Sequence, residues 1–328
     1  MPEPLVAVTR GDCIESVHRG HIVVTDESGG ILFRLGDPSF NLCLRSCAKP
    51  LQALPVIATG AADRYRLTPA ELAVMCGSLN GQDFQVAAVR SILEKIGAGE
   101  GHLKCGIHQP SHRHTAQRLK EAGSAATPLH NNCAGKHAAM LTLCAHHGWP
   151  FDEYISMKHP VQHLVRNAIA SLTGVSAPEI GMGIDGCGVP VFFLPLAGLA
   201  RAYARLASAA DPHVVRLMNA ALSHPEMIAG DERVCTDIMR TLKKKVFAKT
   251  GAEGGYALSL MEKGWGVAIK IEDGSNRALS PVVIETLSHL GMVTGDELMR
   301  LQPYHRIPLY NHRREIVGEI SARFSLAC

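Results

Sequence analysis

The stretch Arg45-Ser-Cys-Ala-Lys-Pro-Leu-Gln52 stands where a strand-rich beginning gives way to a long helix-rich region. Within it, Ser46 and Lys49 have the S-x-x-K spacing, and residues three apart share one face of a helix. Pro50 suits a first helical turn. The pattern therefore predicts Ser46 at a helix start, where free backbone N–H groups favour a developing negative charge. The alternative is an N-cap serine next to a solvated lysine.

Two more short motifs follow in order. Ser78-Leu-Asn80 comes after a predicted helix that begins at the capping box Thr68-Pro-Ala-Glu71, and Lys249-Thr-Gly251 lies in a predicted strand–turn–strand segment. S-x-x-K, S-x-N and K-T-G together are typical of enzymes that transfer acyl groups through a serine. A lysine kept neutral by burial can activate such a hydroxyl. The alternatives are ordinary turn residues at 78–80 and a solvated lysine that protects a sheet edge.

Two glycine-bearing loops carry one cysteine each. They read His130-Asn-Asn-Cys-Ala-Gly-Lys-His137 and Gly183-Ile-Asp-Gly-Cys-Gly-Val-Pro190. Two thiolates with nitrogen or oxygen ligands suit zinc, and His137 or Asp185 would be a ligand or the partner of one. A ligand at Lys136 must first lose its proton, which costs about 4.6 kcal/mol at pH 7. The alternative is two half-buried cysteines that pack as small hydrophobic side chains.

The composition is that of a globular protein. Hydrophobic residues make up 46% and charged residues 19% of the 328 positions, and the formal net charge of +3 favours neither nucleic acid nor a membrane surface as a required partner. The first residues lack the pattern of a signal peptide, and no stretch reaches the roughly 18 apolar residues of a membrane span. We therefore expect a cytoplasmic location and ten reduced cysteines rather than disulfides.

Strand-like runs lie near both ends of the chain, at residues 5–9, 21–25, 31–35, 246–272 and 314–321. Almost everything between is helical in pattern, as at residues 82–96, 160–173, 196–207, 211–222 and 231–242, and a late helix is expected at 276–290. The sequence thus predicts an α/β (α+β) fold in which strands from both ends form one sheet. A single catalytic domain over 1–328 would have a sheet lobe (1–45 plus 244–328) and an inserted, mainly helical lobe (46–243), with the site in the cleft between them.

Five blocks of the sequence resemble the rhizobial-type, or third-class, L-asparaginases, often called asparaginase II. This family is related to serine β-lactamases and serine-dependent glutaminases. The blocks are Arg45-Ser-Cys-Ala-Lys-Pro-Leu-Gln52, Cys76-Gly-Ser-Leu-Asn80, Asn131-Asn-Cys-Ala-Gly-Lys-His137, Ile184-Asp-Gly-Cys-Gly-Val-Pro190 and Lys249-Thr-Gly-Ala-Glu-Gly254.

The resemblance implies a serine-β-lactamase-like fold and a homodimer that hydrolyses L-asparagine to L-aspartate and ammonia. It implies two catalytic serine–lysine pairs and a zinc site completed by water. The pairs would be Ser46 with Lys49 and Ser78 with Lys249, and the metal ligands would be Cys133, Lys136 and Cys187.

In the expected mechanism Lys49 takes the proton of Ser46, which attacks the side-chain amide of asparagine. Backbone N–H groups near Ser46 or Ser78 would form the oxyanion hole. Zinc would organise the site, although a metal-bound hydroxide is an alternative nucleophile. The candidates for holding the charged ends of the substrate are Arg45, Asn80, His137 and Asp185, with a structural ion pair as the alternative for Arg45.

Other functions fit parts of the same pattern. The nearest enzymatic alternative is a glutaminase or another β-lactamase-like amidase or esterase. A non-catalytic zinc or thiol sensor would use Cys133 and Cys187, and it would bind metal without turning over an amide. The serine–lysine motifs weigh against the sensor because it has no use for them.

Overall fold

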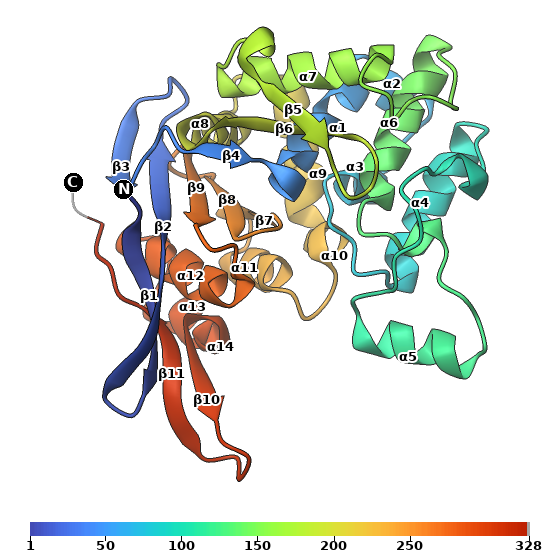
Figure 1. Ribbon diagram of the computed structural model, residues 1–328. Helices are drawn as coiled ribbons and strands as arrows, with labels where there is room; N and C mark the ends of the chain where they lie inside the picture. The colour runs from blue at the N-terminus through green and yellow to red at the C-terminus, as the bar shows by residue number, and fades with distance from the viewer. Residues whose placement is uncertain (327–328) are drawn as a thin grey trace. The chain divides into compact units, whose positions relative to one another are not determined.

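The computed structural model describes residues 1–326, and its chain forms two compact units (Figure 1). Unit 1 comprises Met1–Cys47, Leu194–Ala207 and the described part of Asp237–Cys328, whereas unit 2 comprises Ala48–Phe193 and Ser208–Thr236. Unit 1 also contains residues 46–47, 194–207 and 237–243, which the sequence analysis placed in the helical lobe of residues 46–243; they include the helix of residues 196–207 and the end of the helix that finishes at Leu242.

Unit 1 is built on a sheet of eight antiparallel strands within residues 1–326, drawn from both ends of the chain as predicted. The order is β10-β11-β1-β2-β9-β8-β7, and β3 pairs with β2. The strands are β1 (Glu3–Arg10), β2 (Cys13–Thr25), β3 (Ile31–Leu35), β7 (Val246–Thr250), β8 (Gly255–Leu260), β9 (Trp265–Ile271), β10 (Arg306–Tyr310) and β11 (Ile316–Ala322). The mixed α/β class predicted from the sequence is confirmed.

Helix α8 (Leu196–Ala207) packs on β9, β8 and β2 of this sheet. Contact is so close at Gly266 in β9 that a Cβ there would lie 1.9 Å from the carbonyl oxygen of Ala200. Ser259 in β8 donates a hydrogen bond from its Oγ to the carbonyl oxygen of Tyr203 (2.7 Å). These contacts explain why α8 belongs to the sheet unit, although the sequence places it within the helical region.

The remaining short elements of unit 1 lie before α8 or near the end of the chain. In Figure 1, α12 and α14 lie beside the red and orange strands of this unit. The elements are β4 (Asn41–Cys43), the 3-10 turn η1 (Arg45–Ala48), α11 (Val234–Leu242), η5 (Asn276–Ala278), α12 (Leu279–His289), α13 (Gly295–Arg300) and α14 (Gln302–His305), with η1 and α11 running across the boundary between the units.

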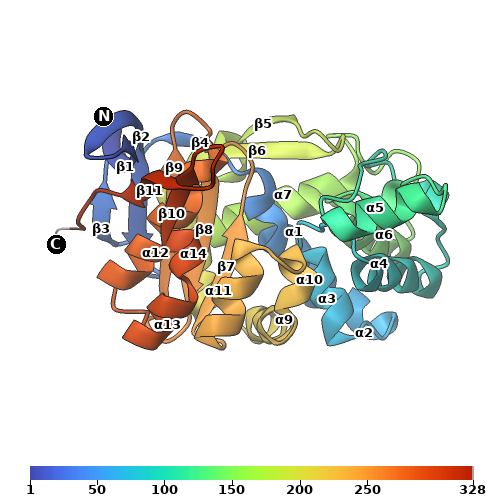
Figure 2. The same cartoon turned by 90° about the horizontal axis from the view of Figure 1, so that it is seen from below.

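Unit 2 is mainly helical. Its helices are α1 (Lys49–Ala58), α2 (Ala61–Arg64), α3 (Pro69–Met75), α4 (Asp83–Lys95), η2 (Glu100–His102), α5 (Arg113–Glu121), η3 (Pro128–His130), α6 (Ala134–His147), α7 (Pro160–Thr173), η4 (Ala177–Glu179), α9 (Pro212–Ser223) and α10 (Pro225–Ala229). Figure 2 shows α3 beside α9 and α4 beside α6, as their contacts require. Every residue of α6 from Ala134 to Cys144 is buried.

Two local predictions in unit 2 are confirmed, namely Pro50 in a first helical turn and the capping box of Thr68 and Glu71. Pro50 lies in the first turn of α1. Thr68 and Glu71 form the predicted capping box of α3, with each side chain bonded to the other residue's backbone N–H. Gly148 ends α6 in a left-handed conformation, with φ +70°. These signals work because each depends on the backbone groups of a single turn.

The prediction of an almost wholly helical region between 46 and 243 is wrong at one hairpin. Strands β5 (Gly181–Ile184) and β6 (Pro190–Pro195) pair antiparallel across a short turn. A brief apolar run cannot be told from a buried helix by periodicity alone. This hairpin holds the turn that carries Asp185 and Cys187.

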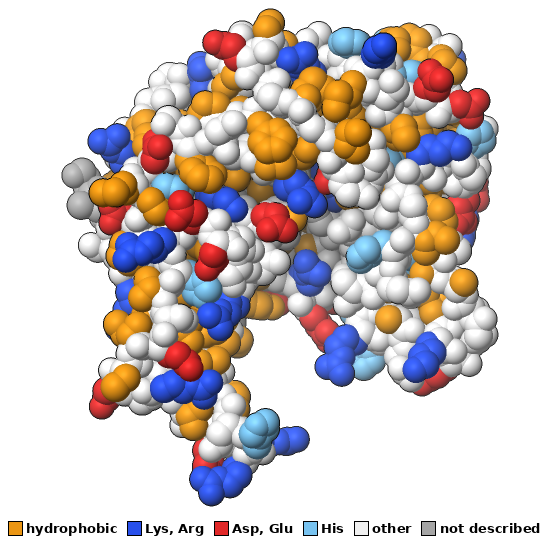
Figure 3. Space-filling view, in the orientation of Figure 1, with side chains coloured by type: hydrophobic (Ala, Val, Ile, Leu, Met, Phe, Trp, Pro, Cys, Tyr) orange, Lys and Arg blue, Asp and Glu red, His pale blue; other side chains and the backbone are white. Residues whose placement is uncertain are grey.

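Two further features concern membrane-spanning helices and the distribution of charged side chains on the surface. Within residues 1–326 no helix is both long and apolar enough to cross a membrane. The space-filling view shows Lys, Arg and His side chains at the tip of the hairpin between β10 and β11 (Figure 3), where the sequence reads Asn311-His-Arg-Arg314.

Candidate active site

The segment that carries Ser46 is fixed against strand β7 inside unit 1. Ser46 is half-buried in η1, and its neighbour Cys47 is fully buried. The thiol of Cys47 lies 3.6 Å from the carbonyl oxygen of Lys249, and Tyr203 donates its hydroxyl to the Cys47 carbonyl oxygen (2.9 Å). The first and third motifs are therefore neighbours in space, although about 200 residues separate them.

Two backbone features support this contact. A Cβ at Gly251 would lie 2.9 Å from the Cys47 sulfur, so the glycine of K-T-G is needed for close approach. Arg45 has φ +44°, a left-handed conformation that is costly for a residue other than glycine. Such strain is often found at functional sites. Here it lies directly before the candidate nucleophile.

Lys249 is fully buried at the edge strand of the sheet. Its Nζ donates to the carbonyl oxygen of Thr250 (2.9 Å). The alternative of a solvated lysine that guards a sheet edge is therefore wrong for this side chain.

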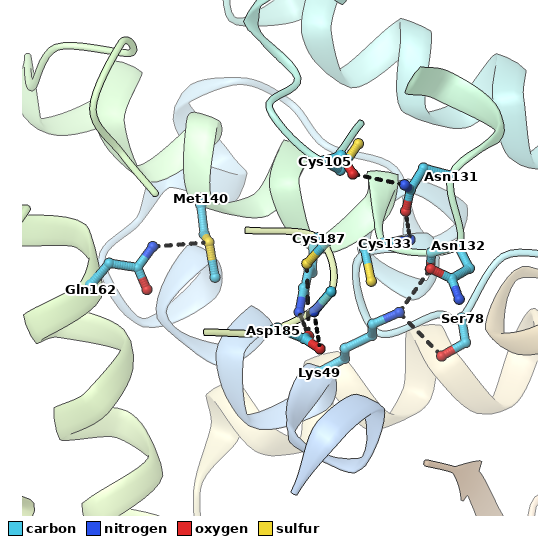
Figure 4. Close-up of polar contacts among 12 residues, drawn as sticks. Lys49, Ser78, Cys105, Asn131, Asn132, Cys133, Met140, Gln162, Asp185 and Cys187 are labelled. Carbon is cyan, nitrogen blue, oxygen red and sulfur yellow. Dashed lines mark hydrogen bonds and ion pairs between the residues drawn. The ribbon is translucent and has the colours of Figure 1, made fainter. Parts of the chain in front are cut away.

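The first and second motifs meet in unit 2 through Lys49 (Figure 4). Lys49 is fully buried. Its Nζ lies 3.1 Å from Ser78 Oγ and donates to the carbonyl oxygen of Asn132 at 2.7 Å. The alternative of an N-cap serine beside a solvated lysine is excluded, because Lys49 is buried and the N-cap of α1 is Ala48, which makes no side-chain cap.

The surroundings of Lys49 favour its uncharged form. Burial is the largest effect and lowers the pKa of its ammonium, and Lys136 lowers it further, whereas Cys133, Cys187 and Asp185 act in the opposite direction. A neutral amine has two N–H groups and one lone pair, and one N–H already serves the Asn132 carbonyl. The lone pair is thus able to accept the proton of a serine hydroxyl.

The side chain of Asn80 and the backbone N–H of Ser78 both make hydrogen bonds within unit 2. The Ser78 N–H donates to the carbonyl oxygen of Ile228 (2.7 Å), which removes it from the candidate oxyanion donors. Asn80 is 1% exposed, and its side chain donates to the carbonyl oxygen of Asp231 (3.3 Å). This contact gives Asn80 a structural role in the loop, whatever it does toward substrate.

Three buried side chains form a group that could hold a metal ion. The ligand atoms of Cys133, Asp185 and Cys187 all lie within 4.8 Å of one another in the described part of the chain. Lys136 is beside them, with its Nζ 2.6 Å from Asp185 Oδ2. Two thiols and a carboxylate are a donor set that zinc accepts, so the residues present fit the metal expected from the resemblance.

The pKa values of the two cysteine thiols in this group shift in opposite directions. The hydrogen bond from Cys187 is the largest effect on Cys133 and, with Lys49 and Lys136, holds the pKa of its thiol well below the ordinary value despite burial. The same hydrogen bond and burial raise the pKa of Cys187. Within this pair Cys133 is therefore the thiol that loses its proton more readily.

Lys136 is an ammonium in this arrangement. Burial works against its charge, but Cys133, Cys187 and Asp185 outweigh burial and raise its pKa. A cation bound to the thiolates would have to displace that proton before Lys136 became a ligand. Asp185, expected from sequence to hold substrate, therefore lies among the candidate metal ligands as well.

His137 is fully buried behind the group. Tyr154 Oη accepts a hydrogen bond from the Lys104 N–H (2.9 Å) and makes a second hydrogen bond with His137 Nδ1 (2.5 Å). Burial is the main cause that lowers the pKa of His137 well below its ordinary value, and Lys136 and Lys49 add to it. His137 is therefore a neutral imidazole.

Sequence reasoning missed two neighbouring asparagines. Asn131 accepts the Cys133 N–H on its Oδ1 (2.8 Å) and donates to the carbonyl oxygens of Cys105 (2.9 Å) and Gly106 (3.0 Å). The first contact is a local turn between residues two apart, which an asparagine before Cys133 could have suggested. The carbonyl of Asn132, which binds Lys49, carries no signal in the sequence because every residue has one.

The comparison with protein families agrees with the motifs. The sequence model of the L-asparaginase II family matches residues 6–322. A comparison with curated proteins finds no match. Among solved structures, the chain is similar to a beta-lactamase candidate from Bacteroides dorei DSM 17855, with 12% identity, a TM-score of 0.43, and coverage of 82% of this chain and 93% of that one.

A beta-lactamase from Mycobacterium bovis is similar to the same degree, with 15% identity, a TM-score of 0.43, and coverage of 82% of this chain and 94% of that one. The family match covers almost the whole sequence, including all three motifs and both cysteine loops. On that ground the chain belongs to the L-asparaginase II family.

Proposed function

We propose that this protein hydrolyses L-asparagine to L-aspartate and ammonia by serine acyl transfer, with Lys49 as the base. Membership of the family supports an amidohydrolase that binds a small-molecule substrate. The observation that carries the proposal is a fully buried Lys49 whose Nζ lies 3.1 Å from the hydroxyl oxygen of Ser78. The role of Ser46 rests on its S-x-x-K spacing from Lys49 and on the left-handed backbone at Arg45 directly before it. An uncharged buried amine beside a hydroxyl is the arrangement that activates serine without histidine.

In the proposed reaction Lys49 accepts the proton of the Ser46 hydroxyl as Ser46 Oγ attacks the side-chain amide carbon. The C–N bond then breaks, and ammonia leaves with a proton supplied through Lys49 and Ser78. Water attacks the resulting ester, releases aspartate and restores the Ser46 hydroxyl. Lys249, also buried, would assist the second serine, and the left-handed Arg45 before Ser46 supports Ser46 as the nucleophile.

Zinc would be held by Cys133 and Cys187 with Asp185 or Lys136, and it would supply a positive charge that organises the substrate-binding side of the pocket. The chain's own residues perform every proton transfer proposed above. Arg45, Asn80, His137 and Asp185 are proposed to hold the charged ends of the substrate. A homodimer and a cytoplasmic location are also proposals. Gel filtration with light scattering tests the first of these, and cell fractionation tests the second.

The proposed function is tested by ammonia release from L-asparagine and, separately, L-glutamine. We expect faster release from L-asparagine, and faster release from L-glutamine would make the protein a glutaminase. Metal binding without release from either amide would favour the sensor. Hydrolysis of an ester or a β-lactam in place of both amides would favour the broader β-lactamase-like alternative.

The roles of the two serines are tested by single substitutions. Ser46→Ala is expected to lower kcat by at least about 10³-fold, since loss of a nucleophile removes the covalent route. Ser78→Ala is expected to lower kcat less, by about 10²-fold, as for loss of a proton-transfer group. Ser223→Ala, at an exposed serine of α9, is the control. Turnover in Ser46→Ala together with none in Ser78→Ala would make Ser78 the nucleophile instead.

A further inference from the structure

In the loop that carries Ser78, three consecutive backbone N–H groups donate hydrogen bonds to other segments. The donors and acceptors are Ser78 N–H to Ile228 O (2.7 Å), Leu79 N–H to Asn132 O (3.1 Å) and Asn80 N–H to Gln85 Oε1 (3.0 Å). Each acceptor belongs to a different segment of unit 2. The position of the serine is therefore set by several neighbours, and one of them is Ile228 in α10, just before the segment of residues 230–231.

That segment and the serine loop are joined by a reciprocal pair. Gln82 Nε2 donates to Asp231 Oδ2 at 3.1 Å, and the Asp231 N–H donates to Gln82 Oε1 at 2.8 Å. The two bonds run in opposite directions between the same two residues. A pair of this kind fixes orientation as well as distance, because both bonds must be kept at once.

The side chain of Asn80 packs closely against the backbone of Gly230 beside this pair. A Cβ at Gly230 would lie 2.1 Å from Asn80 Nδ2 and 2.3 Å from Asn80 Oδ1, and Gly230 has φ +85°. Only glycine suits both the conformation and the space. A side chain at position 230 would therefore displace the Asn80 amide, which itself donates to the carbonyl oxygen of Asp231 (3.3 Å).

We propose that Gln82 and Asp231 are positioning residues, whose reciprocal pair holds the 78–82 loop and so keeps Ser78 Oγ at hydrogen-bond distance from Lys49 Nζ. The inference rests on the proposed function, in which Lys49 and Ser78 move protons. Neither Gln82 nor Asp231 is proposed to touch substrate. Small displacements of a reacting group are costly, since an error of about 1 Å can lower the rate about 10²-fold.

The test exchanges the amide and the carboxylate between positions 82 and 231. Steady-state kinetics and the amide hydrogen exchange of residues 78–80 measure the effect. Gln82→Glu places two carboxylates face to face and should lower kcat for L-asparagine by about 10–100-fold, leave KM within about twofold, and speed exchange of the three amides. The double variant Gln82→Glu/Asp231→Asn restores a donor opposite an acceptor. It should recover both kcat and slow exchange.

Gln117→Glu is the matched control, because Gln117 Nε2 donates to Glu121 Oε1 (2.7 Å) on the exposed face of α5. This variant makes the same clash of carboxylates elsewhere in unit 2 and should change neither measurement. Unchanged kcat and exchange in Gln82→Glu would overturn the proposal, and so would failure of the double variant to recover. A wild-type protein that releases no ammonia would end the proposed function, while hydrogen exchange would still decide whether the pair holds the loop.

Discussion

Lys49 is the side chain whose protonation state decides the proposed chemistry. Its ammonium form has three donors and no acceptor, so it cannot take a proton from serine. Burial is the main cause that lowers its pKa from the ordinary lysine value of 10.5. The neutral, active form is thereby populated at lower pH than in an exposed lysine.

We predict that kcat/KM on L-asparagine rises with pH through the pKa of Lys49 and falls as pH drops below it. This acid limb should lie below the ordinary lysine range, because burial lowers the pKa. Lys49→Arg keeps a positive charge but cannot deprotonate, so it should lose about 10²–10⁴-fold in kcat/KM.

Lys95→Arg provides the comparison for that substitution. Lys95 pairs with Glu71 at 2.6 Å and is partly exposed, so arginine should serve there almost as well. A Lys49→Arg enzyme with near wild-type activity would show that Lys49 is not the base.

At the scale of elements, α8 links the sheet of unit 1 to the segment that carries Ser46. Ser259 in β8 binds the carbonyl of Tyr203, and the Tyr203 hydroxyl binds the carbonyl of Cys47. The helix can lie this close to the sheet because position 266 has no side chain. The architecture of unit 1 thus contributes directly to the placement of the first motif.

We predict that Gly266→Ala lowers the free energy of unfolding by more than about 3 kcal/mol, because its methyl group would meet backbone atoms of α8 that cannot move independently. Thermal or urea unfolding measures the change. Gly295→Ala, at the start of α13 where nothing lies within 4 Å of the new Cβ, should change stability by no more than about 1 kcal/mol. Equal stability of the two variants would contradict the packing argument.

In unit 2, the hairpin of β5 and β6 places two of the candidate metal ligands, Asp185 and Cys187. Its turn is held by the Asp185 N–H bonded to the Val189 carbonyl (2.8 Å) and the Gly188 N–H bonded to the Asp185 carbonyl (2.8 Å). These bonds present Asp185 and Cys187 on one side of a tight turn. A helix across the same residues would not place them opposite Cys133 in this way.

At the scale of the whole molecule, a metal that binds only the folded chain should stabilise it. We predict that zinc raises the melting temperature, by an amount equivalent to about 2.7 kcal/mol at a free concentration 100 times Kd. The double variant Cys133→Ser/Cys187→Ser should lose this shift, since it lacks both thiolates. Differential scanning calorimetry with and without a chelator measures the effect.

Cys13→Ser is the control for the zinc experiment, because Cys13 is exposed and lies outside the group. It should retain the full shift. A zinc-dependent shift of equal size in the double variant would place the metal elsewhere in the protein.

The sequence by itself determined what depends on neighbouring residues. The capping box at Thr68, Pro50 in a first helical turn, and strands at both ends of the chain could all be predicted, because helix starts and strand alternation are local patterns. The motif residues could also be predicted, since their chemical types and order are typical of enzymes that transfer acyl groups through a serine. The short hairpin of β5 and β6 could not, because a few apolar residues suit either state.

Only the tertiary structure decided which motif residues meet and in what charge state. The sequence pairs Lys49 with Ser46 by spacing, whereas folding brings Lys49 to Ser78 and to the Asn132 carbonyl oxygen, which no pattern marks. It likewise places Asp185 between two cysteines and sets Gln82 against Asp231. Contacts between distant segments, and the burial that lowers the pKa of an amine, arise from packing of the whole chain, so they cannot be read from any single stretch of it.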